Sequence, residues 1–406
     1  METEKTMQQL KKIAFVIPWF GWDIPGGAEA ECRGIAEHMH LSGVETEILT
    51  TCVEKFTADW DVDFHKPGEY REHGMVIRRF KVDKRKDVAR FAFINNKLMN
   101  NDLPLSRVEE EDFQKNMVNS SDLYRYIAEH KSEYSLFIFI PYMFGTTYYG
   151  LQECYDQAVI IPCLHEEGYI HMDIFAEVFS RVKGMIFHAK PEEELARQVY
   201  NLDRVNAQTL GEGIYTDFTF DADRFREKFG IHHPFILYAG RKDVGKNVHA
   251  LLSMFEEYKY THGNTLKMVL IGGGEVEIPS SVVGDVYDLG YVDLQDKYDA
   301  YAAASMLCQP SKHESFSLVI MESWMAGRPV LVHGGCDVTK HFASVSNGGF
   351  YFDNYYEFER QVDTLLAHPE LADRMGENGR KFVLENFAWD RIVEKYTKFF
   401  LECAGQ

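Results

Sequence analysis

The sequence predicts an α/β protein with two doubly wound, Rossmann-like domains in tandem, each built on a mostly parallel sheet. Its 406 residues are too many for one ordinary hydrophobic core, and they favour two domains of about 200 residues each. The chain opens with a strand, a glycine-rich loop, a helix and a second strand, which is the typical start of such a domain. The same rhythm starts again at Phe235–Ala239. We therefore predict one α/β domain over residues 1–212 and a second over residues 213–388.

The first domain is expected to hold a series of buried strands, because short apolar stretches recur between polar ones. These stretches are residues 13–18, 47–51, 75–82, 136–140, 159–162 and 185–187. Apolar residues at positions 28, 32, 35 and 39 have the spacing of a helix. This helix follows a loop that ends in Gly26 and Gly27. Glycines there let the backbone approach a ligand closely at the helix start.

A long polar and charged stretch, residues 83–131, interrupts this rhythm. The simpler interpretation is a helical excursion on the surface of the first domain. The alternative is a lid or an acceptor-binding element, since long insertions often carry function. Residues 206–213 then lead out of the domain.

The second domain is expected to repeat the pattern, and a last helix within residues 389–406 follows it. Its strands are predicted at Phe235–Ala239, Lys267–Ile271, residues 286–289, Met306–Gln309, residues 329–332 and residues 350–352. Helices at residues 250–260, 293–304 and 357–367 fill gaps between these strands. In doubly wound folds ligands bind at the carboxyl ends of the parallel strands, so two such domains favour a cleft between those ends.

Charge and cysteine content narrow the classes of partner. The formal net charge of −20 argues against nucleic acid and against strong binding to an anionic membrane surface, while weak peripheral association stays open. The seven cysteines form no C-x-x-C pair, which fits a reducing cytosol and disfavours disulfides or a zinc site. The polar start of the chain has no secretory signal, and no apolar run could span a bilayer. We expect a cytoplasmic protein without a transmembrane segment.

The most informative stretch, residues 310–327, is expected to form a strand exit, a loop and a helix. Either of two serines, Ser315 or Ser317, can cap the helix start with its hydroxyl. Gly327 can stop the helix after Ala326.

Two carboxylates, Glu314 and Glu322, lie in this stretch, the first in the loop and the second inside the helix. Eight helical residues advance the chain by about 12 Å and rotate it by about 80°. The two side chains therefore cannot flank one bond as the paired acids of glycosidases do. The spacing instead indicates two separate contacts to one long ligand, beside a helix N-terminus that favours anions.

A basic turn, residues 240–247, follows the strand Phe235–Ala239 with the pattern G-x-x-x-x-G-K-N. A nucleotide P-loop needs Ser or Thr after the lysine to hold magnesium, and Asn247 is a poor replacement. The functional interpretation is that Arg241 and Lys246 present two cations to a diphosphate. A solvated basic turn is the alternative.

Two further features are weaker signals. The triplet of glycines at residues 272–274 lacks the last glycine of a dinucleotide fingerprint, so we interpret it as a tight turn that can wall a nucleotide pocket. His165 follows a predicted strand of the first domain, where it could bond a sugar hydroxyl or the reacting centre. A purely structural histidine is the alternative.

Together these motifs resemble the retaining glycosyltransferases of family 4, which have the GT-B fold. The matching motifs, in order, are Gly240-Arg241-x4-Lys246-Asn247, the Gly272 turn, Leu289-Gly290-Tyr291-Val292, Glu314-x7-Glu322 and Gly327-x-Pro329-Val330. In the first domain the loop Pro25-Gly26-Gly27-Ala28-Glu29 and the His165 loop are similar too. The resemblance covers nearly the whole chain apart from residues 53–130. Two departures, Ser323 in place of the usual alanine and an unusual stretch at residues 334–339, would tune the substrate.

The resemblance implies a role for each matching residue. It implies that Arg241 and Lys246, with Gly26 and Gly27, bind the donor diphosphate, and that Glu314 and His165 contact the donor sugar at the reacting centre. It implies that backbone amides hold the sugar and phosphate, namely those of Ser315, Phe316, Ser317 and Leu318. For the nucleoside it implies that Glu322 bonds the ribose and that the base lies near Tyr291 and Val292. It also implies that the last helix crosses back to the first domain, and that neither a metal ion nor a cofactor is needed.

The expected activity is therefore transfer of a sugar from a UDP- or GDP-linked donor to a saccharide or lipid-linked saccharide, in glycan biosynthesis and with retention of configuration. One alternative is a sugar-nucleotide epimerase or a phosphorylase on the same fold. The other is a non-catalytic GT-B subunit that stabilises a partner transferase.

Overall fold

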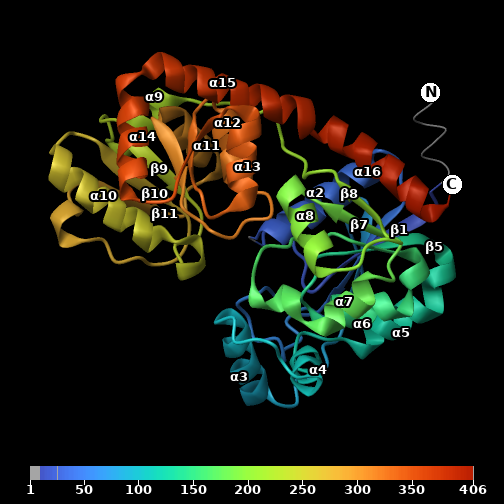
Figure 1. Ribbon diagram of the computed structural model, residues 1–406. Coiled ribbons are helices and arrows are strands. Elements are labelled where there is room, and N and C mark those ends of the chain that lie inside the picture. The colour runs from blue at the N-terminus through green and yellow to red at the C-terminus, as the bar shows by residue number, and fades with distance from the viewer. Residues whose placement is uncertain (1–9, 25, 406) are drawn as a thin grey trace. The chain divides into compact units, whose positions relative to one another are not determined.

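The computed structural model describes residues 10–24 and 26–405. The polar start of the chain and Pro25 of the glycine loop, on which two expectations rested, lie outside the described residues. The chain divides into two compact units, Met1–Gly213 with Trp389–Gln406 (unit 1) and Ile214–Ala388 (unit 2). Each unit is built on its own sheet (Figure 1).

Unit 1 has an eight-stranded sheet in the order β3-β4-β2-β1-β5-β6-β7-β8. Its strands are β1 (Lys12–Ile17), β2 (Thr46–Thr51), β3 (Gly68–Glu72), β4 (Met75–Phe80), β5 (Tyr134–Phe139), β6 (Ala158–Ile160), β7 (Gly184–Phe187) and β8 (Asn206–Thr209). The edge strand β3 pairs antiparallel with β4, and the other neighbours are parallel. The sequence analysis missed β3, whose side chains are mostly exposed and polar. Its tight turn places His73 and Gly74 at φ 50° and 82°, as a two-residue hairpin of the common type requires.

Eight α-helices are described in unit 1, and most of them cover the two faces of this sheet. They are α2 (Gly27–Leu41), α3 (Val88–Met99), α4 (Arg107–Lys115), α5 (Ser121–His130), α6 (Gly145–Glu153), α7 (Asp173–Phe179), α8 (Lys190–Val199) and α16 (Trp389–Ala404). The polar stretch at residues 83–131 therefore does fold into helices. Of these, α3 and α4 contact each other and stand out from the rest of unit 1 (Figure 1).

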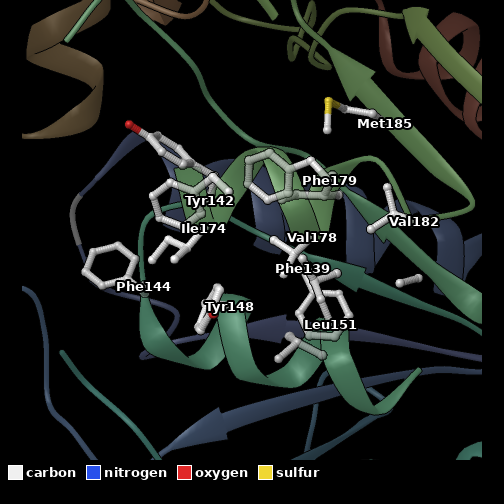
Figure 2. Packing of buried hydrophobic residues seen from close by; sticks show 14 of the residues in the cluster. Phe139, Tyr142, Phe144, Tyr148, Leu151, Ile174, Val178, Phe179, Val182 and Met185 are labelled. Carbon is white, nitrogen blue, oxygen red and sulfur yellow. The ribbon is translucent and has the colours of Figure 1, made fainter. Parts of the chain in front are cut away.

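The central strands of unit 1 are buried on both faces, which explains their nearly continuous apolar sequences. On one face Phe139 of β5 packs into a large cluster with α5, α6 and α7. Figure 2 shows part of this cluster, where Tyr148 and Leu151 of α6 gather with Ile174 and Phe179 of α7. The other face is covered by α2 and α16.

The last helix, α16, docks through Trp389 at its start. The indole stacks on His38 of α2, with ring centroids 3.9 Å apart. A Cβ added to Gly34 or to Gly213 would lie 2.5 Å or 2.3 Å from the indole carbons. Two glycines therefore make the space that this ring fills.

Unit 2 has a six-stranded, fully parallel sheet in the order β11-β10-β9-β12-β13-β14. Its strands are β9 (Phe235–Ala239), β10 (Lys267–Ile271), β11 (Val286–Gly290), β12 (Met306–Gln309), β13 (Val330–His333) and β14 (Gly349–Phe352). Its helices are α9 (Ala222–Phe229), α10 (Val248–His262), α11 (Leu294–Ala303), α12 (Leu318–Met325), α13 (Asp337–Ser346), α14 (Tyr355–Ala367) and α15 (Pro369–Asn386). The strand order reverses direction between β9 and β12, and such a switch point is where open α/β sheets bind ligands.

All seven cysteines fall within the described residues and are free thiols. In the same part of the chain, the helices are all too short or too polar to cross a membrane.

Candidate functional site

The switch point of unit 2 brings the loops after β9, β10 and β11 into contact. Lys242 N donates to Gly273 O at 2.7 Å, and Gly272 N donates to Gly290 O at 2.7 Å. A Cβ on Gly272 would lie 2.1 Å from Gly240 O, and the residue has φ +116°. Only glycine fits this close approach, so the glycine triplet forms a tight turn against the basic turn.

An ion pair joins the two loops that leave β9 and β12. Lys246 Nζ lies 2.7 Å from Glu314 Oε1, and Gln309 Nε2 donates to the same oxygen at 3.3 Å. Asp243 fixes the turn that carries the lysine, because its Oδ1 accepts from Lys246 N at 3.0 Å. The structure thus brings together two residues that the sequence placed 68 positions apart.

The side chain of Asn247 connects this turn to the loop after β12. Its backbone is left-handed (φ 58°), which asparagine tolerates better than most residues, and its Nδ2 donates to Pro310 O at 3.0 Å. The asparagine therefore ties the loop after β9 to the loop after β12, and the resemblance of this turn to a P-loop does not extend to a magnesium ligand.

The start of α12 differs from the expected serine cap. Ser317 occupies the cap position with φ 82° and ψ 79°, and among the described residues its hydroxyl makes no capping bond. A capping side chain needs an extended backbone at that residue, which Ser317 lacks. Its Oγ is buried without a partner in the described residues, as is Gln309 Oε1. One of these atoms lies at the start of α12 and the other at the end of β12, so both offer hydrogen-bonding capacity at this edge of the sheet.

Glu322 is held inside the second turn of α12 by two groups of α11. Lys297 Nζ lies 2.7 Å from Oε1, and Tyr301 OH donates to Oε2 at 2.8 Å. Each carboxylate oxygen keeps acceptor capacity beyond these bonds. The sequence analysis missed both partners, although a lysine and a tyrosine four residues apart share one face of a predicted helix.

The other residues assigned to the donor surround this edge in different ways. Arg241 is exposed, and its Nε lies 3.4 Å from Asp243 Oδ2. Tyr291 is 74% exposed and lies over Gly273, where a Cβ would meet its hydroxyl at 2.4 Å. The further residues are Val292, Ser315 and Leu318, which are half-buried. The Phe316 side chain belongs to the core instead, packed on two other phenylalanines, so only its backbone could reach a ligand.

In unit 1 the glycine loop leads directly into α2. Gly26 has φ +150°, and a Cβ there would lie 1.9 Å from Glu29 Oε2. Gly27 is the first residue of the helix. Trp19 Nε1 donates to Glu29 Oε1 at 2.5 Å, which fixes the carboxylate beside the loop. The positive φ of Gly26, together with the carboxylate beside it, favours glycine at this position.

His165 lies in the loop after β6, next to an acidic partner. Its Nε2 is 3.1 Å from Glu167 Oε2, and its side chain is 31% exposed. Tyr142 OH donates to the other oxygen of the same carboxylate at 2.7 Å. The imidazole is therefore accessible but held by a fixed partner.

Residues 220–382, which contain all six strands of unit 2, match the family model of glycosyl transferases group 1. Unit 2 is therefore a group 1 glycosyltransferase domain. Over nearly the full length, the chain is similar to the uncharacterized glycosyltransferase MJ1607 of Methanocaldococcus jannaschii. The two are 21% identical over 404 residues, which is 95% of this chain and 96% of that protein.

Solved structures show the same fold over nearly the whole chain. Sucrose-phosphate synthase from Thermosynechococcus elongatus matches with a TM-score of 0.69 at 15% identity, over 97% of this chain and 98% of that one. HepE from Anabaena in complex with UDP-glucose matches with a TM-score of 0.68 at 14% identity, over 97% and 100%. These likenesses confirm the predicted GT-B fold with its two parallel-sheet domains.

Unit 1 also holds a buried charged cluster that the sequence analysis did not find. Among the described residues, Glu31, Cys163 and His188 form the group of potential metal ligands that lie close together. His188 Nε2 is 2.5 Å from Glu31 Oε1, and its Nδ1 is 3.1 Å from Glu192 Oε2. Although burial disfavours its charge, these carboxylates hold the pKa of His188 well above the usual value. The contacts of the imidazole with two carboxylates make this group an ion-pair network.

Proposed function

We propose that this glycosyltransferase takes its sugar from a nucleoside-diphosphate sugar at the carboxyl edge of the unit 2 sheet. It transfers that sugar to a saccharide or lipid-linked saccharide with retention of configuration, and it needs no metal ion. The observation that carries the proposal is the Lys246–Glu314 pair, 2.7 Å apart, beside the start of α12. A basic group, an anion-favouring helix start and a carboxylate at one switch point match the phosphate and sugar parts of such a donor.

The chemistry follows from the leaving group. Breaking the bond between the sugar and the phosphate leaves a nucleoside diphosphate, so the site must stabilise growing phosphate charge. In our proposal Lys246, Arg241 and the amides at the start of α12 supply that stabilisation, as a metal ion would in other transferases. Lys246 exchanges its contact with Glu314 for a phosphate oxygen when the donor binds.

The sugar carbon passes through an oxocarbenium-like state, with Glu314 and His165 as its proposed contacts. Family resemblance supports retention by attack from the side of the leaving group, whose phosphate oxygen takes the proton of the acceptor hydroxyl. Glu322 would bond the ribose, since its carboxylate is already oriented by Lys297 and Tyr301. The HepE complex with UDP-glucose supports a UDP-linked donor over a GDP-linked one.

The seven free thiols support a reducing compartment such as the cytosol, where we place the reaction.

Calorimetric titration with UDP and GDP, in EDTA and then in Mg²⁺, tests the donor site. We expect UDP to bind in EDTA and UDP-linked sugars to release UDP slowly by hydrolysis. Proton NMR of the first glycoside formed should show the anomeric configuration of the donor. Failure of every nucleoside diphosphate to bind would overturn the proposal, and binding only with Mg²⁺ would overturn its metal-independent part. An epimerised donor, or a product that forms only with orthophosphate, would favour the epimerase or the phosphorylase.

A further inference from the structure

The loop that carries His165 contains a strained residue. Cys163, two positions earlier, has φ 58°, a left-handed conformation that is uncommon for residues other than glycine, asparagine and aspartate. Such a conformation costs of the order of a kcal/mol, and it persists only where the surrounding structure holds it. Contacts on both sides of Cys163 provide that hold.

The first contact comes from Glu192 at the start of α8. Its Oε1 accepts from Leu164 N at 2.7 Å, the amide of the residue that stands between Cys163 and His165. Its Oε2 accepts from His188 N at 2.7 Å and faces His188 Nδ1 at 3.1 Å. One buried carboxylate therefore fixes the loop after β6 and the end of β7 together.

The second contact comes from Glu31 of α2, on the other side of the loop. Cys163 Sγ lies 3.6 Å from Glu31 Oε2, and His188 Nε2 lies 2.5 Å from Glu31 Oε1. His188 thus bridges Glu31 and Glu192, the two carboxylates that contact the loop after β6. The side chains of His188, Glu31 and Glu192 are all at most 2% exposed.

Further charged and titratable groups also face this network. Glu212 is buried after β8 and, with Tyr396 of α16, lies close enough to influence it electrostatically. Tyr396 OH donates to Gly211 O at 3.0 Å. Buried ion pairs of this kind stabilise a protein only weakly, while in some proteins they specify one arrangement of their surroundings.

We propose that Glu31, His188 and Glu192 form a positioning clamp that fixes the backbone of residues 163–165 and thereby aims His165. The proposal rests on the proposed function, in which His165 contacts the donor sugar at the reacting centre. The three clamp residues are buried, and in this proposal they act through the loop. A loop released from the clamp relaxes toward ordinary backbone angles and moves the imidazole away from its working position.

The test compares Glu192→Gln with the matched control Glu194→Gln, an exposed residue of the same helix. The side-chain amide of the Glu192→Gln variant has a single oxygen, which cannot accept from both Leu164 N and His188. We therefore expect hydrogen exchange at Leu164 to quicken at least about tenfold. We expect kcat to fall by about tenfold to a hundredfold, the loss typical of a misplaced reacting group. UDP affinity and donor KM should stay within about twofold, and the control should match the wild type.

A second variant provides a rescue. Glycine adopts φ 58° without strain, so Cys163→Gly combined with Glu192→Gln should recover part of the kcat lost by Glu192→Gln alone. Unchanged exchange at Leu164 together with wild-type kcat would overturn the clamp. Faster exchange throughout unit 1 with an equal loss of UDP binding would also overturn it, because the role would then be general stability. A wild-type protein that binds no nucleoside diphosphate contradicts the proposed function, whereas exchange at Leu164 still decides whether the loop is clamped.

Discussion

At the scale of single residues, the Lys246–Glu314 pair combines opposite charges that are mostly buried. Their side chains are 23% and 10% exposed, so each charge is only partly solvated and depends on the other. In the proposed donor complex, the diphosphate gains the lysine as a partner. The carboxylate that the lysine leaves would then face the donor sugar, where positive charge develops in the transition state.

Replacing either member of this pair should lower turnover more than it lowers stability. We expect Lys246→Ala and Glu314→Ala each to reduce kcat at least about tenfold, the loss expected when a contact to developing charge is removed. Circular dichroism should show an intact fold, because Glu314 lies in a loop and Lys246 at the end of a single 3₁₀ turn, Val244–Lys246. The matched control is Glu370→Gln, an exposed change in the first turn of α15, which should keep the wild-type kcat. Wild-type turnover in either alanine variant would remove that residue from the site.

The sequence predicts which residues lie at the carboxyl edge of the unit 2 sheet, but it predicts few of their contacts. The order of a lysine after β9 and two glutamates after β12 identifies the pattern, and the parallel sheet brings the two loops together. The left-handed backbone of Ser317 leaves no trace in the sequence, because serine is a common helix cap. His188 and Glu192 were missed because each alone resembles an ordinary residue of a strand end and a helix start.

At the scale of elements, the strands were predicted best where both faces are buried. The bounds predicted for β9, β10 and β12 agree with the structure because short apolar runs leave little choice. The long helix α15 was missed, since two glycines interrupt its sequence and glycine disfavours helices. The buried stripe of this helix contains both, Gly376 and Gly379, and they let α15 approach α12 closely.

This close approach gives a prediction for the stability of unit 2. A Cβ on Gly376 would lie 2.0 Å from Gly327 O, a backbone atom that cannot turn aside. Alanine normally stabilises a helix relative to glycine by about 0.5–1 kcal/mol, but overpacking costs about 1–3 kcal/mol. We therefore expect Gly376→Ala to destabilise unit 2, whereas Glu377→Ala on the exposed side should change stability by less than about 0.5 kcal/mol. Native-state hydrogen exchange at the amides of β12 and β13 measures both, and a stabilised Gly376→Ala protein would contradict the packing argument.

At the scale of the whole molecule, the two α/β units follow from chain length and from the repeated strand–helix rhythm. The formal net charge of −20 also follows from the sequence alone and does not depend on the fold. Fold-level features of this kind are set by many residues at once, so a few misplaced boundaries do not change them. Features that depend on one backbone angle, such as that of Cys163, are set by tertiary contacts and appear only in the structure.

Acid should weaken unit 1 through one carboxylate that joins four strands of its sheet. Glu47 of β2 accepts from Tyr134 OH of β5 at 2.6 Å, from Arg78 Nε of β4 at 3.0 Å and from Lys12 Nζ of β1 at 3.2 Å. Burial opposes its charge, but these hydrogen bonds outweigh burial and hold the pKa of Glu47 below its usual value of 4.5. The unfolded chain therefore binds this proton more readily than the folded one. The stabilisation is fully present above about pH 4.5 and is lost as the pH falls through the lowered pKa.

Glu47→Gln should remove this pH dependence. At pH 7 we expect the variant to be less stable by about 1.5–3 kcal/mol, the range for hydrogen bonds to a charged group. The difference from the wild type should shrink as the pH falls below about 4.5, since the wild-type carboxylate then takes up its proton. Glu45→Gln, an exposed change two residues earlier, is the matched control and should follow the wild type at every pH. Hydrogen exchange at the amides of β1 and β2 across this range measures the free energy of unfolding of unit 1. A constant difference between Glu47→Gln and the wild type from pH 7 to pH 3 would show that packing, rather than the charge of Glu47, joins these strands.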